Sequence, residues 1–97
     1  MNKIDFMIEI IVTSMDPNFK NCDFVACTIL RNSNFMQWNR CYIIATKEQG
    51  ILLKRLLPGE DTSHLVAVSD NKEFPPFKIP VDDITGIAMV AGLIRLE

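Results

Sequence analysis

The chain has 97 residues, of which 48% are apolar and 23% charged, and its net charge at pH 7 is −2. This length permits one modest hydrophobic core, and the ordinary apolar fraction excludes a disordered chain. Because there is no surplus of positive charge, we expect no direct contact between this chain and nucleic acid. The apolar run from Ile8 to Val12 is interrupted by Glu9 and is far shorter than the roughly 20 residues of a membrane span, so no membrane association is expected.

The cysteines and the single histidine limit the chemistry that the chain can carry. Cys22, Cys27 and Cys41 are odd in number, lack C-x-x-C spacing and follow no secretory signal, which predicts three reduced thiols in a cytoplasmic protein. A zinc site would need more partners than His64 offers, and a cysteine–histidine nucleophile pair has no local signature. We therefore predict neither a metal site nor a cofactor.

The first forty residues contain two predicted strands. Asp5 to Val12 is rich in isoleucine and is followed by a turn at Asp16-Pro17-Asn18, because proline fixes its own φ and Asp and Asn tolerate turn geometry. Asp23 to Leu30 has the β-branched and aromatic content of a second strand. A polar turn over 31–34 and a loop over 35–39 around Trp38 follow it.

A β-hairpin is predicted in the middle of the chain. Cys41 to Thr46 and Ile51 to Leu57 flank Lys47-Glu48-Gln49-Gly50, a short connection that ends in glycine. After a turn over 58–61, His64 to Val68 has the composition of a further strand.

The last quarter of the chain is predicted to end in a strand. Phe74-Pro75-Pro76-Phe77 is excluded from the centre of a sheet because neither proline can donate to a ladder. Gly86 to Leu96 is apolar and is predicted as a closing strand; a helix over 82–92 is the alternative, which two glycines and β-branched residues disfavour. Together these elements predict one small, mainly antiparallel all-β domain spanning residues 1–97.

A serine and a lysine are the candidate catalytic residues. Leu52, Lys54 and Leu56 share one face of their strand, and burial of that face would lower the pKa of Lys54, as a general base requires. Ser14 follows the first strand at the mouth of a tight turn, so the two side chains could form a Ser/Lys dyad. Each residue also has a simpler interpretation: Ser14 as a turn residue that bonds its own backbone, and Lys54 as a solvated charge on an edge strand.

Several blocks of the sequence resemble peptidase family S24, the C-terminal domain of LexA-like and phage-repressor-like transcriptional regulators, which shares its fold with type I signal peptidases. The blocks are Ser14-Met15-Asp16-Pro17, Asn21-Cys22-Asp23-Phe24-Val25, Tyr42-Ile43-Ile44, Gly50 to Leu56, Ser69-Asp70-Asn71 and Phe74-Pro75-Pro76-Phe77. Their order and spacing both match the family.

The resemblance implies roles for individual residues. Ser14 would be the nucleophile, Lys54 its neutral general base, and the backbone N–H groups of Ser14 and Met15 the oxyanion donors. In the family this dyad cuts an Ala-Gly or similar bond in the regulator's own linker. Cleavage is stimulated by the recombinase filament that forms on single-stranded DNA in the SOS response, and the domain forms a homodimer.

Three features depart from the family pattern. Val12 stands where the family usually has glycine, Cys22-Asp23 stands where it tends to have Gly-Asp, and only thirteen residues precede Ser14. Because those residues hold neither a DNA-binding helix-turn-helix domain nor a linker, we expect either a domain excerpt or a short relative, with the linker of a partner regulator as a possible substrate.

Three alternatives to the active peptidase remain open. The first is a catalytically inactive dimerisation and regulatory module, whose interface would be the apolar closing strand from Ile87 to Leu96, taken as an edge strand. The second is a soluble serine protease similar to signal peptidases. The third is a β-rich binding domain in which the match to the family is coincidental.

Overall fold

The computed structural model describes residues 4–9, 23–30 and 37–94, and every structural statement below concerns that part of the chain. Its strands form one antiparallel seven-stranded sheet in the order β1-β2-β7-β3-β4-β5-β6. The strands are β1 (Phe6–Glu9), β2 (Phe24–Ile29), β3 (Arg40–Thr46), β4 (Gly50–Pro58), β5 (His64–Val68), β6 (Phe77–Pro80) and β7 (Ile84–Ile94). A short 3-10 helix, η2 (Val81–Asp83), precedes β7. The predicted all-β class is therefore confirmed.

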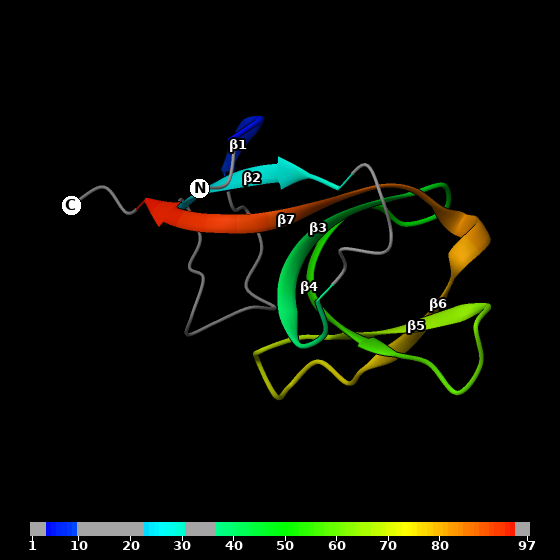
Figure 1. Ribbon diagram of the computed structural model, residues 1–97. Helices are drawn as coiled ribbons and strands as arrows, with labels where there is room; N and C mark the ends of the chain where they lie inside the picture. The colour runs from blue at the N-terminus through cyan, green and yellow to red at the C-terminus, as the bar shows by residue number, and fades with distance from the viewer. Residues whose placement is uncertain (1–3, 10–22, 31–36, 95–97) are drawn as a thin grey trace.

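The sheet is strongly curved rather than flat. Figure 1 shows β2 and β7 along one side of the molecule and β5 and β6 along the other, with β3 and β4 curving between them. Because of this curvature, β6 comes to face β7 although the two strands are far apart in the order of the sheet.

The predicted hairpin is present between β3 and β4. The pairing runs from Thr46 opposite Gly50 to Arg40 opposite Leu56. Gly50 has a φ of 74°, which glycine adopts without the steric cost of a Cβ. The Thr46 hydroxyl donates to the Gly50 carbonyl at 2.9 Å and accepts from the Gln49 N–H at 3.0 Å, so the threonine side chain closes the turn.

The closing strand is present, but its predicted place at the edge of the sheet is wrong. β7 begins at Ile84 and lies between two neighbours, with β2 paired along one side and β3 along the other. Both edges of β7 are thus paired. Ala88, which lies opposite both Ile29 and Ile43, is only 4% exposed, whereas Leu93 and Ile94 at the end of the strand are each 42% exposed. The helix considered over 82–92 does not form.

One edge strand was not predicted. β6 starts at Phe77, directly after the two prolines, and pairs with β5 alone. The prolines Pro75 and Pro76 precede it and Pro80 ends it, as expected for residues that cannot donate to a ladder. At the start of the chain, β1 (Phe6–Glu9) lies within the strand predicted from Asp5 to Val12; Asp5 precedes it, and residues 10–12 lie outside the described ranges.

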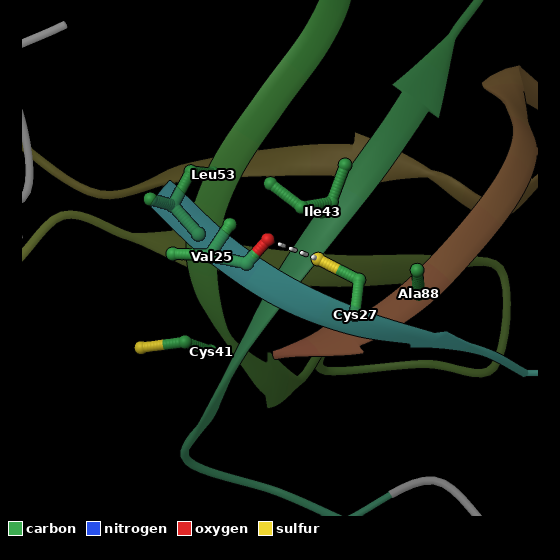
Figure 2. Packing of buried hydrophobic residues seen from close by; sticks show 6 residues of the cluster. All are labelled: Val25, Cys27, Cys41, Ile43, Leu53 and Ala88. Atoms are coloured by element: carbon green, nitrogen blue, oxygen red, sulfur yellow. Dashed lines mark hydrogen bonds between the residues drawn. The ribbon is translucent and has the colours of Figure 1, made fainter. Parts of the chain in front are cut away.

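Two apolar clusters occupy the two faces of the sheet. The first cluster, shown in Figure 2, consists of Val25, Cys27, Cys41, Ile43, Leu53 and Ala88. The second cluster lies inside the curve, draws on four strands from β3 to β6, and consists of Tyr42, Ile44, Leu56, Ala67 and Ile79. Leu53 and Leu56 therefore belong to opposite faces of β4, as the predicted alternation requires.

Cys27 and Cys41 are both free thiols in the first cluster. Figure 2 shows the Cys41 side chain pointing away from Cys27. Burial raises the pKa of each thiol to about 11, so both stay protonated and unreactive at neutral pH. Cys22 lies outside the described residues. Within the described ranges, no helix has the length and apolar character needed to span a membrane.

Candidate functional site around Lys54

Lys54 on β4 forms a buried pair with a serine on the neighbouring strand. In the β4–β5 ladder Arg55 lies opposite Val68, so the next step of the same register places Lys54 opposite Ser69, the first residue after β5. Lys54 Nζ lies 2.7 Å from Ser69 Oγ. The two residues are only 7% and 4% exposed, respectively, so the amine and the hydroxyl meet away from bulk water.

Two phenylalanine rings cover the amine. Lys54 Nζ lies 5.9 Å from the centre of the Phe74 ring and 6.0 Å from that of Phe77. These distances are at the outer limit of a cation–π interaction, so the rings act mainly by excluding water. Phe74 is 42% exposed, and the cover therefore separates the amine from solvent by the thickness of one side chain.

Burial shifts the protonation equilibrium of Lys54. Desolvation lowers the pKa of Lys54 below its ordinary value of 10.5, because a charged ammonium loses more hydration than a neutral amine. The hydrogen-bond partner of Nζ is an uncharged hydroxyl rather than a carboxylate that would hold the proton in place. A lysine in these surroundings can give up its proton and act as a general base.

A second pair, on the opposite face, fixes the same two segments. Arg55 Nε and Nη2 donate to Asp70 Oδ1 and Oδ2 at 2.6 and 3.2 Å, and Nη1 donates to the Asn39 carbonyl at 3.1 Å. The Asp70 side chain is 7% exposed and the Arg55 side chain 30%. The hydrogen bond to Asp70 raises the pKa of Arg55, which stays charged. Consecutive residues of β4 thus bind consecutive residues after β5, one pair on each face.

The predicted site is partly within the described chain. Lys54 shares a face with Leu52 and Leu56, as predicted, and this face is buried. Ser14 and Met15 lie outside the described residues, so the dyad and its oxyanion donors stay predictions.

Ser69 was missed as a partner of Lys54, although it belongs to one of the quoted sequence blocks. The sequence did not fix the register that brings them together. Pairing the ends of the predicted strands, residue 57 with residue 64, would place residue 67 opposite Lys54, whereas the observed register pairs Arg55 with Val68 and so places Ser69 there.

A serine, a histidine and an aspartate also meet in the turn before β5, but they cannot form a catalytic relay. Ser63 Oγ donates to Asp61 Oδ1 at 2.6 Å, and both groups approach the same ring nitrogen, His64 Nδ1, at 2.9 and 3.2 Å. A relay would need the serine and the carboxylate on different ring nitrogens. The hydrogen bonds from Ser63 and His64 lower the pKa of Asp61 to about 2, so this cluster is a charged turn.

Among the described residues, no group of three or more His, Cys, Asp or Glu side chains could hold a metal ion. Comparison of the sequence with protein-family models and with curated proteins gives no match. The resemblance to peptidase family S24 therefore rests on the sequence blocks quoted above.

Proposed function

We propose that the chain is a peptidase domain of the LexA-like and phage-repressor-like kind, in which Lys54 activates Ser14 to cut a peptide bond. The observation that carries this proposal is the burial of the Lys54 amine against Ser69 under two phenylalanine rings. A lysine that served only solubility would extend into water, because burial of an ammonium group costs free energy. Burial has a use when the neutral amine has to accept a proton.

The proposed reaction is an acyl transfer followed by hydrolysis. Ser14 Oγ attacks the carbonyl carbon of the scissile bond, and its proton passes to Lys54 Nζ. The backbone N–H groups of Ser14 and Met15 donate to the oxyanion. The Lys54 ammonium then protonates the leaving amine, and the neutral amine activates the water that releases the acyl group from Ser14. Ser69 supports these steps by fixing the direction of the amine.

The substrate and partners follow from the same proposal. The bond to be cut lies in the linker of a regulator, either the chain's own or that of a partner, and a recombinase filament on single-stranded DNA acts as the stimulating co-protease. The domain acts in the cytoplasm as a homodimer. It contacts neither DNA nor membrane directly.

A second candidate is a dimerisation and regulatory module without proteolysis. The observation that favours it is that Lys54 and Ser69 satisfy each other, so the pair could serve only to join β4 to the segment after β5. In that case the protein would dimerise but would cleave nothing at any pH.

Cleavage of a peptide in trans separates the two candidates. A peptide with an Ala-Gly bond is incubated with the protein between about pH 7 and pH 10, because only unprotonated Lys54 can accept the serine proton. We expect cleavage to rise with pH and to be lost in Ser14→Ala and Lys54→Ala, while Lys47→Ala, which removes an exposed lysine from the hairpin turn, cleaves normally. A rate that neither active-site substitution changes would exclude the dyad. Light scattering on the same samples reports dimerisation.

A further inference from the structure

A pocket of about 750 Å³ opens at the far end of β5 from Ser69. Its apolar lining includes Leu65, Ile84 and Ile87, which also pack against the second cluster. Its volume is in the range of small-molecule sites. The pocket shares no residue with the Lys54–Ser69 pair, so it needs an explanation separate from the proposed peptidase chemistry.

An aromatic side chain forms part of the pocket. Trp38 lines it and is 46% exposed, which is unusual for so large an apolar side chain. Indole rings carry negative charge density on their faces and bind cations better than the other aromatic side chains do. A half-exposed indole in a concave apolar surface is therefore suited to a ligand that is both apolar and positively charged.

Two carboxylates stand among the lining residues. Glu60 and Asp61 contribute to the pocket, and their side chains are 88% and 64% exposed. The hydrogen bonds from Ser63 and His64 keep Asp61 ionised. Glu60 pairs with Lys78, whose Nζ lies 3.8 Å from Glu60 Oε2 and whose side chain is 60% exposed. Such a long, solvated ion pair contributes little to stability, so a ligand cation can take the place of Lys78 beside Glu60.

We propose that this pocket binds a small organic cation, with an alkylammonium or trimethylammonium head and an apolar body. The Trp38 face and the carboxylates of Glu60 and Asp61 receive the head, and the leucine and isoleucine side chains receive the body. An anionic ligand of the same shape is repelled by the two carboxylates. A neutral ligand of the same shape gains only the apolar contact.

Trp38 makes the test direct because it is the only tryptophan in the chain. Its fluorescence and the NMR signal of its indole N–H are followed during titration with three probes of nearly equal shape: choline, tert-butylethanol, in which carbon replaces the nitrogen, and the anion of tert-butylacetic acid. We expect saturable shifts with choline, binding about two- to fivefold weaker for the neutral alcohol, and the weakest binding for the anion. Equal affinity for the three probes, or no shift with choline at millimolar concentration, would overturn the proposal.

Variants that remove charge test whether Glu60 and Asp61 cause the preference for choline. In a Glu60→Gln, Asp61→Asn double variant, the preference for choline over the alcohol should fall while binding of the alcohol persists. Glu73→Gln removes the same type of charge at the opposite end of β5 and should leave the preference unchanged. The folded state of each variant is verified by its NMR spectrum. A double variant that keeps the full preference, or a Glu73 variant that loses it, would contradict the assignment to this pocket. None of these results depends on proteolysis, so the outcome is independent of the proposed peptidase function.

Discussion

Lys54 and Ser69 are 15 residues apart in the sequence, yet Nζ and Oγ lie 2.7 Å apart because the antiparallel register of β4 and β5 places them opposite each other. The next residue of each segment forms the Arg55–Asp70 ion pair on the other face of the sheet. Because side chains alternate along β4, the Lys54 amine meets a neutral partner on one face and the Arg55 guanidinium meets a carboxylate on the other. Only the amine is left in surroundings that favour loss of its proton.

Substitution of Ser69 tests whether this hydroxyl matters to the buried amine. Ser69→Ala removes the partner of a buried Nζ and should lower the free energy of unfolding by about 1–3 kcal/mol, because a buried polar group is left unpaired. Thr62→Ala, which removes a hydroxyl in an exposed turn, is the matched control and should change it by less than about 0.5 kcal/mol. Urea unfolding measures both. Equal effects of the two substitutions would show that Ser69 does not support Lys54.

Replacement of Lys54 by an apolar residue separates stability from catalysis. In Lys54→Met the new side chain has a similar length but no charge, and it would lie against Phe74 and Phe77. We expect it to cost less than about 1.5 kcal/mol, or to stabilise the fold, because removing the desolvation cost of the amine offsets the loss of its hydrogen bond to Ser69. The same variant should have no peptidase activity. A loss of several kcal/mol in thermal or urea unfolding would instead indicate that Lys54 is kept for structure.

The lowered pKa of Lys54 makes stability depend on pH. Between the folded-state pKa and the ordinary value of 10.5, the unfolded chain binds more protons at this group, so stability rises with pH. The wild type should therefore gain stability relative to Lys54→Met as the pH rises towards 10.5. Cys27 and Cys41 have the opposite effect: because burial raises the pKa of each to about 11, they lower stability as the pH rises above the ordinary cysteine value. Both proteins contain these cysteines, so their effect cancels in the comparison. A constant difference between the two proteins would contradict the shift.

The Arg55–Asp70 pair should matter more than an exposed ion pair. Asp70→Asn weakens two hydrogen bonds at a carboxylate that is only 7% exposed, and we expect a loss of about 1–2 kcal/mol, since the exposed part of Arg55 moderates the cost. Glu60→Gln removes one partner of the exposed pair with Lys78 and should change stability by less than about 0.5 kcal/mol. Urea unfolding of both variants is the measurement. A smaller effect for Asp70 than for Glu60 would refute the ranking.

The parts of the fold that depend on local sequence could be predicted. Gly50 identified the β3–β4 hairpin, and the alternation around Lys54 identified which leucines share its face. These features depend on turn geometry and on the period of two along a strand, both of which neighbouring residues specify.

The parts of the fold that depend on pairing between distant segments could not be predicted from the sequence. The apolar sequence of β7 was equally compatible with an edge strand, and only its pairing with β2 and β3 places it inside the sheet. Ser69 was missed for the same reason, because its meeting with Lys54 depends on the register between two strands. The prolines around β6 excluded a central strand but did not reveal the edge strand between them.

The pKa of the Lys54 amine tests the central claim most directly. Lysine side chains labelled with carbon-13 at Cε are titrated by NMR, and the Lys54 signal is assigned by its absence in Lys54→Arg. We predict that Lys54 titrates below the ordinary lysine value of 10.5, because burial disfavours its charged form. Titration of Lys54 at the ordinary value of 10.5 would contradict its role as a neutral base.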